Sequence, residues 1–287
     1  MKRRMLVSAA AVLLVTAHVA VSQRDFSKVE FERTHVAGAV HFLNSGVAGN
    51  LAVSMGEDGV LLVDDQYAPL ADKIRASIEE IGGGKLKFLV NTHYHGDHTG
   101  GNAEFGEEAA IIGHANVRKR LASQERPEVA LPAVTFKDSV TIHFNGEAIE
   151  IVHLPNGHTD SDSVVYFRGS NVVHMGDLFF SGLFPFVDLK AGGDVEGYMS
   201  NLEKVIPGIP AGAKIIPGHG PLSTLDDLKA FHRAMRETTG YIRGQMDSGK
   251  SLEQIQAAGL PSEWEEWGSG FISEERWISI VYNSYSG

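Results

Sequence analysis

The chain has 287 residues, with 25 basic against 36 acidic side chains and no cysteine. A content of 43% hydrophobic and 21% charged residues is typical of a globular protein long enough to bury a sizeable core. The lack of cysteine excludes disulfides, thiolate metal sites and cysteine nucleophiles, so any metal must be held by nitrogen and oxygen. The net charge of -11 disfavours binding to nucleic acid or anionic lipid.

The N-terminal segment, residues 1–22, is expected to be a signal peptide. Lys2, Arg3 and Arg4 precede a largely apolar run to about Ala20, which is shorter than the ~20 residues of a membrane-spanning helix. An uncleaved anchor is the alternative, and the two arginines could form a weak twin-arginine signal. We therefore expect a periplasmic or secreted protein without stable membrane insertion after cleavage.

The apolar pattern in the rest of the chain predicts strands and helices in alternation. Strands are expected at 34–43, 50–55, 60–63, 86–90 and 109–112, with helices at 68–81 and about 115–123. Residues 91–102, rich in histidine, are expected to form a loop. Beyond them we expect four strands over roughly 138–176, a long loop at 179–193, a helix at 195–206, a short strand at 214–216 and helices from Leu225 onward.

The loop at 91–102 concentrates residue types that bind metals. It contains three imidazoles and one carboxylate within six residues. On an extended segment His93 and His95 point to the same side, while a turn after them lets Asp97 and His98 reach a second ion. The spacing predicts a dinuclear site.

Three further ligand-type residues follow predicted strands, so they are expected at the same sheet edge. They are His158 in Gly-His-Thr, Asp177 in Gly-Asp and His219 in Pro-Gly-His-Gly-Pro. Each alone is more often a structural or turn residue. Together they predict one metal held by His93, His95 and His158, a second held by Asp97, His98 and His219, and Asp177 free to bridge.

These motifs, in this order, resemble those of the metallo-β-lactamase-fold hydrolases over roughly residues 35–222. The resemblance implies an α/β fold, an αββα sandwich with the metals at one edge between two sheets. The catalytic domain would span residues 23–222, and a C-terminal helical extension packed on it would span 223–287. Two Zn²⁺ per chain are expected, although nitrogen and oxygen ligands would also accept Fe or Mn.

Two carboxylates are candidates for orienting the ligands. Asp64 matches the family's aspartate at the end of an early strand, which orients the metal loop, or is a plain turn carboxylate. Asp162 either orients a ligand in the same way or is a solvated loop carboxylate.

The expected chemistry is hydrolysis of a small-molecule carbonyl substrate by a metal-activated water, with Asp97 orienting that water or moving its proton. In the commonest zinc β-lactamases a cysteine stands in place of Asp177, and a lysine that grips the substrate in place of Phe180. We expect at least weak β-lactamase activity, with a lactonase or glyoxalase-like thioesterase as the alternative. A non-catalytic metal-binding protein of the same fold is a second alternative. The sequence leaves the oligomeric state open.

The loop at 179–193 is expected to supply the substrate pocket. Phe180, Phe184 and Phe186 would form its apolar wall, unless they pack the core instead. Basic residues of the C-terminal helices either bind a substrate such as glutathione or form a solvated helix face; they are Lys229, Arg233, Arg236 and Arg243. Outside the motifs, His114 and His153 are the histidines that we single out.

Overall fold

The computed structural model describes residues 25–286, so the expected signal peptide lies outside the described residues. The unit that begins at Phe31 contains every helix and strand named below. Within residues 25–286 no helix is both long enough and apolar enough to cross a membrane.

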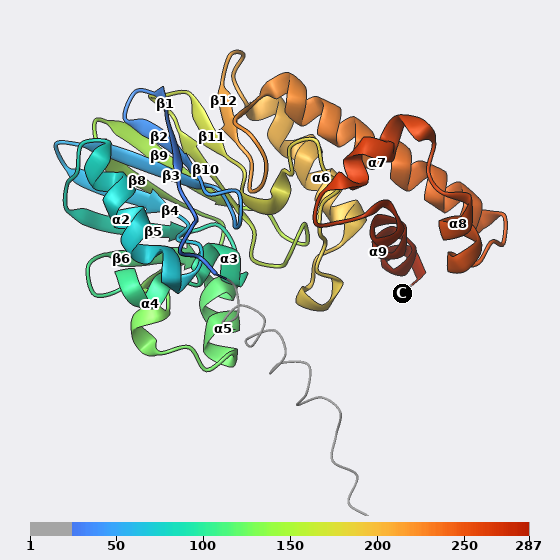
Figure 1. Cartoon of the computed structure of the whole chain (residues 1–287), viewed down its shortest axis with the longest axis horizontal. Helices are drawn as coiled ribbons and strands as arrows, with labels where there is room; N and C mark the ends of the chain where they lie inside the picture. The colour runs from blue at the N-terminus through green and yellow to red at the C-terminus, as the bar shows by residue number, and fades with distance from the viewer. Residues whose placement is uncertain (1–24, 287) are drawn as a thin grey trace, which may run out of the picture. The chain divides into compact units, whose positions relative to one another are not determined.

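The first of two sheets contains seven strands, which neighbour one another in chain order (Figure 1). They are β1 (Glu32–Ala37), β2 (Val40–Asn44), β3 (Leu51–Gly56), β4 (Gly59–Val63), β5 (Leu86–Asn91), β6 (Ala110–His114) and β7 (Val134–Phe136). Strands β1 to β4 form an antiparallel meander, whereas β4 to β7 run parallel. Strand β4 is a run of Val and Leu buried on both faces, as is usual for a parallel strand covered by helices.

The second sheet contains six strands in the order β13-β12-β11-β10-β9-β8. They are β8 (Ser139–Phe144), β9 (Glu147–His153), β10 (Ser163–Phe167), β11 (Val172–His174), β12 (Lys214–Ile216) and β13 (Ser223–Thr224). Only the β11–β12 pair is parallel. Strands β9, β11 and β12 therefore run in one direction, and their C-terminal ends lie at one edge of the sheet.

Apolar side chains from the inner faces of both sheets form the core between them. Alternate residues of a strand point to the same face, so each strand contributes every second residue to this core. Its members include Val40, Phe42, Leu61, Val63, Ile112, Ile149, Ile151, Val165 and Phe167.

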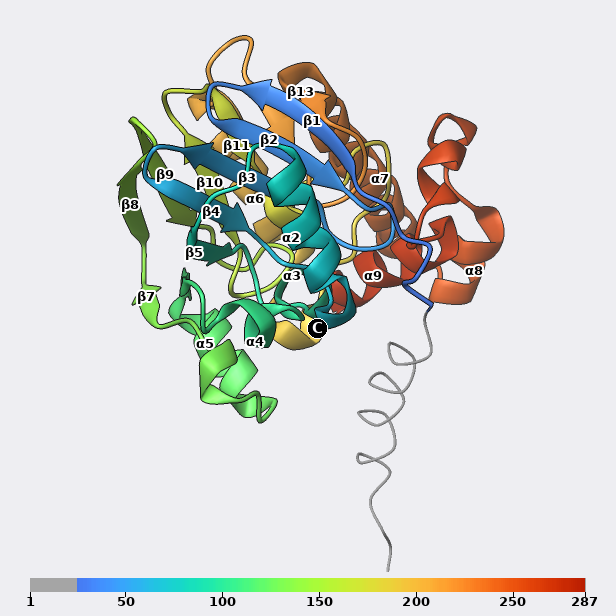
Figure 2. The ribbon, with the colours of Figure 1, turned by 60° about the vertical axis from the view of Figure 1, so that its left-hand side comes forward.

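Helices cover the outer faces of both sheets (Figure 2). On the first sheet they are α2 (Ala71–Glu80), α4 (Asn102–Phe105) and α5 (Ala115–Ser123), with α3 (Gly96–Thr99) at the sheet edge. On the second sheet they are α6 (Val195–Val205) and α7 (Leu225–Asp247), followed by α8 (Leu252–Ala258) and α9 (Glu274–Ser286). The predicted αββα sandwich with a C-terminal helical extension is therefore confirmed.

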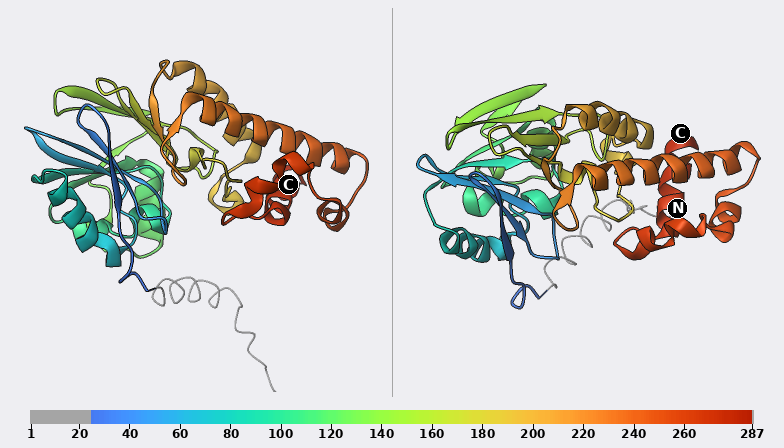
Figure 3. Two further views of the ribbon diagram at one scale, coloured as in Figure 1. Left: turned by 45° about the horizontal axis from the view of Figure 1, so that its top comes forward. Right: turned by 90° about the horizontal axis from the view of Figure 1, so that it is seen from above.

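Helix α7 carries the extension away from the second sheet, and α8 and α9 pack beside it (Figure 3). Its start is defined by a capping box in which Thr224 and Asp227 satisfy each other's backbone N–H groups. Its buried residues recur at helical spacing: Leu228, Phe231, Met235 and Ile242. Trp277 of α9 is fully buried and donates from Nε1 to Oγ1 of Thr238 at 3.0 Å, which ties α9 to α7.

Two local expectations were wrong. The single strand predicted at 34–43 is the β1–β2 hairpin, because Gly38 turns the chain at φ 53°, where a side chain would also meet Ser170. The loop predicted at 91–102 contains the short helix α3, and α4 begins at its last residue, since helices of four residues carry no readable helical period.

His114 and His153 stack on each other where β6 and β9 end. Their ring centroids are 3.5 Å apart and their planes differ by 6°. Nδ1 of His114 accepts from the backbone N–H of Asn116 and so caps α5, while His153 Nδ1 donates to the Asp162 carbonyl at 2.8 Å. Burial and the neighbouring His153 lower the pKa of His114 to about 4, and burial lowers the pKa of His153. The folded protein therefore keeps this pair neutral.

The stacked pair predicts a loss of stability in acid. Because both pKa values are depressed on folding, the unfolded chain binds more protons, so stability is lost as the pH falls from about 6.5 towards 4. We expect the Tm of the wild type to fall more steeply over this interval than the Tm of His153→Gln. Each kcal/mol of unfolding free energy that the wild type loses should lower its Tm by about 2–4 °C. Thermal melts at stepped pH measure this.

His143→Gln is the matched control, because His143 is exposed on β8 and should leave the slope unchanged. Equal slopes for wild type and His153→Gln would show that the pair is not linked to proton uptake.

Candidate metal centre

The seven candidate ligands meet at the edge where strands of both sheets end. His93, His95, Asp97 and His98 follow β5, and Gly96 to Thr99 form α3. In the second sheet His158 lies between β9 and β10, Asp177 follows β11, and His219 follows β12. The fold thus brings together residues that are far apart in the chain, with 126 positions between the first ligand, His93, and the last, His219.

Three histidines and one aspartate form the first group, with ligand atoms all within 4.8 Å of one another. His95 Nδ1 lies 3.1 Å from His93 Nε2 and 2.7 Å from His158 Nε2. Oδ2 of Asp177 lies 3.3 Å from His158 Nε2 and 3.8 Å from His93 Nε2.

Asp97, His98 and His219 form the second group, also within 4.8 Å. The other oxygen of Asp177, Oδ1, lies 3.1 Å from His98 Nε2 and 3.4 Å from His219 Nε2. Asp177 therefore presents one carboxylate oxygen to each group, which is the arrangement of a bridging ligand. Gly218 is required beside it, because any side chain at Gly218 would collide with Asp177 Oδ1.

The buried carboxylate of Asp64 holds ligands of both groups in place. It accepts hydrogen bonds from Nδ1 of His98 at 2.7 Å and from the N–H and Oγ1 of Thr92 at 2.8 and 2.7 Å. Oγ1 of Thr92 in turn lies 3.1 Å from His93 Nδ1. Asp64 thus orients His98 directly and His93 through Thr92, rather than serving only as a turn residue.

Asp162 is buried, so the alternative of a solvated loop carboxylate was wrong. Both its oxygens accept from the Thr159 N–H, and Oδ1 also accepts from the Thr159 hydroxyl at 2.5 Å. Burial raises the pKa of Asp162 to about 8. Its contacts are with the loop that carries His158, not with a ligand imidazole.

The sequence analysis missed Asp188, which lies in the loop between β11 and α6. Its Oδ2 accepts from His95 Nε2 at 3.1 Å and from the Tyr94 hydroxyl at 2.8 Å. The same loop holds the neighbouring ligand, since the Phe186 carbonyl accepts from His158 Nδ1 at 2.6 Å. An aspartate in an aperiodic loop carries no signal that relates it to a histidine 93 residues away.

These outer hydrogen bonds fix which imidazole nitrogens face inward. His95, His98 and His158 each donate one N–H to a protein oxygen, so the other nitrogen of each ring faces inward, and it carries a lone pair in the neutral imidazole. The inward nitrogens of the first group converge with no donor between them. His98 Nε2 and Asp177 Oδ1 are buried and lie 3.1 Å apart, yet neither makes a hydrogen bond of suitable geometry. Divalent cations would satisfy all of these atoms, so the donor set fits two metal ions.

The two groups differ electrostatically. Burial lowers the pKa of His158 to about 4 and that of His93 well below its usual range, so the first group offers neutral imidazoles. In the second group burial is outweighed by the carboxylates, Asp177 first, which raise the pKa of His98 and bring that of His219 to about 9. The second group thus presents two carboxylates, Asp97 and Asp177, that would partly neutralise the charge of a metal ion.

The centre opens to solvent on the side of three ligands. The side chains of His95, Asp97 and His219 are 18%, 25% and 25% exposed, whereas the other four ligands are buried. A substrate therefore approaches past these three side chains.

The three predicted pocket residues have different positions. Phe180 stacks on the imidazole of His219 at 4.9 Å but is only 6% exposed and packs in the core, as the alternative interpretation had it. The Phe186 ring lies 5.9 Å from both His95 and His158. Phe184 does not line the site, and this expectation was wrong. It is 2% exposed and stacks on Trp277 in the helical layer, because the loop turns inward between Phe180 and Phe186.

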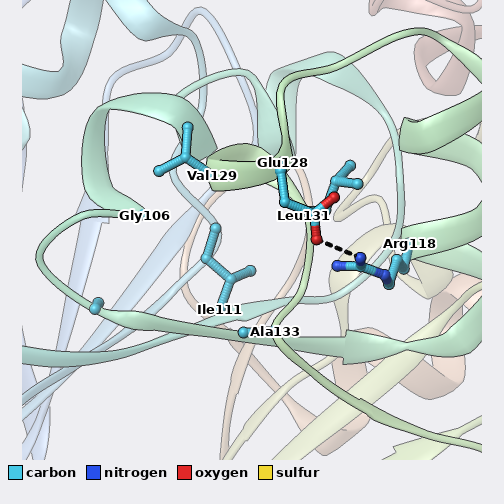
Figure 4. Close-up of a pocket in the computed structure, with 8 residues that line it drawn as sticks. Gly106, Ile111, Arg118, Glu128, Val129, Leu131 and Ala133 are labelled. Carbon is cyan, nitrogen blue, oxygen red and sulfur yellow. Dashed lines mark hydrogen bonds and ion pairs between the residues drawn. The ribbon is translucent and has the colours of Figure 1, made fainter.

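A cavity of about 210 Å³ lies elsewhere, between α5, β6 and the segment before β7 (Figure 4). It is mainly apolar, and Arg118 donates to Glu128 at its edge. Its lining contains none of the seven candidate ligands: Gly106, Ala109, Ile111, Arg118, Glu128, Val129, Leu131 and Ala133. The cavity is therefore separate from the metal centre.

Residues 51–219 match the family model described as the metallo-beta-lactamase superfamily. The chain belongs to this superfamily. The matched segment runs from β3 to His219 and so contains all seven candidate ligands. The fold and the candidate ligand set are therefore those of this superfamily.

Curated relatives fall into more than one activity class. The chain is 33% identical over 139 residues to a hydroxyacylglutathione hydrolase of Pelagibacter ubique, which covers 47% of this chain and 52% of the relative. It is 24% identical over 136 residues to a type 2 metallo-beta-lactamase of Bacteroides fragilis, covering 47% and 54%. The chain thus spans about half the length of the curated relatives it matches.

Solved structures support the fold. A metallo-beta-lactamase from Pontibacter korlensis superposes with a TM-score of 0.65 at 18% identity, covering 72% of this chain and 99% of that one. A sec-alkyl sulfatase superposes with a TM-score of 0.70 at 15% identity, covering 90% of this chain and 50% of that one. The sulfatase therefore superposes on a larger share of this chain than the metallo-beta-lactamase does, 90% against 72%.

Removing the Asp188 carboxylate is expected to weaken metal binding. Asp188→Ala frees His95 to rotate and to change tautomer, so zinc affinity should fall by about 10- to 100-fold. Competition against a chromophoric chelator measures the affinity.

Tyr94→Phe is the matched control, because it removes the second hydrogen bond to the same Asp188 oxygen but leaves His95 attached. We expect a smaller loss for it. Unchanged zinc affinity in folded Asp188→Ala would refute the orienting role.

Proposed function

We propose that the protein is a dinuclear metal-dependent hydrolase of small carbonyl compounds, with thioesters as its better substrates and β-lactams as weak ones. The observation that carries the proposal is the Asp177 carboxylate, which faces both ligand groups at one solvent-accessible edge. Zinc in both positions is the first choice, and nitrogen and oxygen donors also suit Fe or Mn.

When bound, the two cations would lower the pKa of water and polarise the substrate carbonyl. The protein's own side chains orient the reactants. Asp97 is the accessible carboxylate, with Oδ2 3.4 Å from His219 Nε2 and 3.6 Å from His98 Nε2. Burial would raise the pKa of Asp97, but His98 and His219 outweigh it and hold the pKa below its usual range. An ionised Asp97 can hold the attacking water and accept its proton.

Thioesters are favoured by two observations. The second group contains no thiolate, and the Pelagibacter relative is named a hydroxyacylglutathione hydrolase. Phe180 stacks on His219 and is 6% exposed, so a buried aromatic ring and no cation stands beside this ligand.

Weak β-lactamase activity is the second candidate function, and lactone hydrolysis shares the same chemistry. The Bacteroides relative is named a metallo-beta-lactamase, and the expected export of the protein would bring it into the compartment that β-lactams reach. We further propose a periplasmic or secreted location, no nucleic-acid partner and no stable membrane insertion after cleavage of residues 1–22.

Metal removal is expected to abolish hydrolysis. Dialysis against a chelator should reduce turnover to background, and Zn²⁺ should restore it as the metal content approaches two per chain. Metal analysis alongside turnover measures both. Full activity after metal removal would refute the mechanism, and stable metal binding without turnover of any substrate would favour a non-catalytic metal-binding protein.

The ranking of substrates is a separate prediction. We expect kcat/KM to be highest for an acyl thioester, and lower for an acyl-homoserine lactone and a chromogenic cephalosporin. Steady-state kinetics on the zinc-loaded protein measure all three. A cephalosporin that is hydrolysed faster than the thioester would reverse the proposed order, and one left untouched would remove the β-lactamase candidate.

A further inference from the structure

Beside the metal centre, one arginine of α9 packs on two phenyl rings. Cζ of Arg276 lies 5.4 Å from the ring centroid of Phe186 and 4.6 Å from that of Phe271. The two rings meet edge to face, with centroids 6.5 Å apart. Phe271 is 73% exposed, which is the largest exposure among the big apolar residues that the structure describes. Cation–π contacts of this kind hold a guanidinium in place while its N–H edges stay free.

The Arg276 guanidinium has no carboxylate within ion-pair distance among residues 25–286. The helix positions next to Arg276 on the same face are three and four residues before and after it. None of them is acidic, since they are Ile272, Ser273, Ser279 and Ile280. By contrast, Arg75 pairs with Glu108 and Arg120 with Asp160. In a chain with excess negative charge, Arg276 is a cation with unused donors.

The basic residues singled out from the sequence differ from Arg276. All four lie exposed on α7, where Arg233 packs on Trp264, Arg243 on Tyr285, and Lys229 pairs with Asp226. None of these contacts involves a candidate ligand. They fit the solvated helix face that was the alternative interpretation.

Phe186 connects Arg276 to the metal centre. Its ring lies 5.9 Å from the imidazoles of His95 and His158, and its carbonyl holds His158. Its ring also contacts the Arg276 guanidinium. From the centre outward, the surface therefore runs from the partly exposed ligand His95 to an apolar strip of Phe186 and Phe271, with a cation against both rings.

We propose that Phe186, Phe271 and Arg276 form a substrate-recognition surface for acyl compounds that carry an apolar chain ending in a carboxylate. The chain would lie along the two rings, and the carboxylate would accept hydrogen bonds from Arg276. This inference rests on the proposed function for its substrate, and it names the chemical class that the same site selects. In the reaction water adds across the acyl C–S bond, giving a second carboxylate and a free thiol.

The kinetic test uses two thioesters that differ only at the far end of the acyl chain. One is the S-ethyl monothioester of octanedioic acid, and the other is the same compound with its free carboxylate methylated. We expect the wild type to prefer the carboxylate by about tenfold in kcat/KM, mainly through KM. Arg276→Gln should bring this ratio close to one. Arg276→Lys should restore part of it, because an ammonium keeps the positive charge but cannot form the two parallel hydrogen bonds that a guanidinium makes to a carboxylate.

Two variants separate recognition from packing. Arg233→Gln removes an exposed arginine that also lies over an aromatic ring, and it should leave the preference intact. Phe271→Ala should lower kcat/KM for both thioesters by a similar factor, since it removes apolar contact and no charge. If Arg276 only fixed α9 to the loop, Arg276→Gln would lower Tm and would slow both thioesters equally, and the proposal would be overturned.

A binding experiment keeps this inference separate from the proposed function. 6-Mercaptohexanoate and its methyl ester are titrated calorimetrically into the zinc-loaded protein and into Arg276→Gln. Tighter binding of the free acid by about tenfold, lost in Arg276→Gln, supports the recognition surface even if no thioester is hydrolysed. Turnover of both thioesters with no preference in kinetics or in binding overturns the surface and leaves the hydrolase intact.

Discussion

The centre depends on one buried carboxylate that restrains both ligand groups. Asp64 holds His98 directly and His93 through Thr92, and it does so from the end of β4 with φ at 60°. Few residues other than glycine adopt this left-handed conformation, and aspartate is among them. The strain is tolerated because three hydrogen bonds satisfy the side chain in a site without solvent. The parallel pairing of β4 with β5 brings this carboxylate beside the histidine loop.

Four of the ligands could be predicted from sequence because they lie within six residues of one another, and the other three because each follows a predicted strand. Two histidines one residue apart on an extended segment face the same way, and ligand-type residues after parallel strands reach the same sheet edge. The order of strands and helices followed from apolar periodicity, whereas the two-layer sandwich was implied by the resemblance to the family. The hairpin at Gly38 was missed because a single glycine within a strand-like run does not show whether the chain reverses there or continues as one strand.

The support around the ligands could not be predicted, because it depends on contacts between distant segments. Asp188 reaches His95 across 93 positions, and Phe184 turns into the core although Phe186, two residues later, lies against His95 and His158. Arg276 was overlooked among other arginines, since only the packing of α9 on the loop distinguishes it. Aperiodic loops encode their geometry in tertiary hydrogen bonds, which the sequence does not display.

The loop between β11 and α6 both supports metal-ligand histidines and contributes to the proposed recognition surface, so a substitution in it affects both roles. Its Phe186 and Asp188 hold two of the histidines, and the ring of Phe186 is also part of the proposed recognition surface. A substitution that reshapes this wall would disturb the ligands at the same time. Phe271 and Arg276 have no contact with a ligand imidazole among the ring contacts described. Within the proposed recognition surface, α9 and the residues before it can therefore change more readily than the loop, which stays constrained by the two histidines it holds.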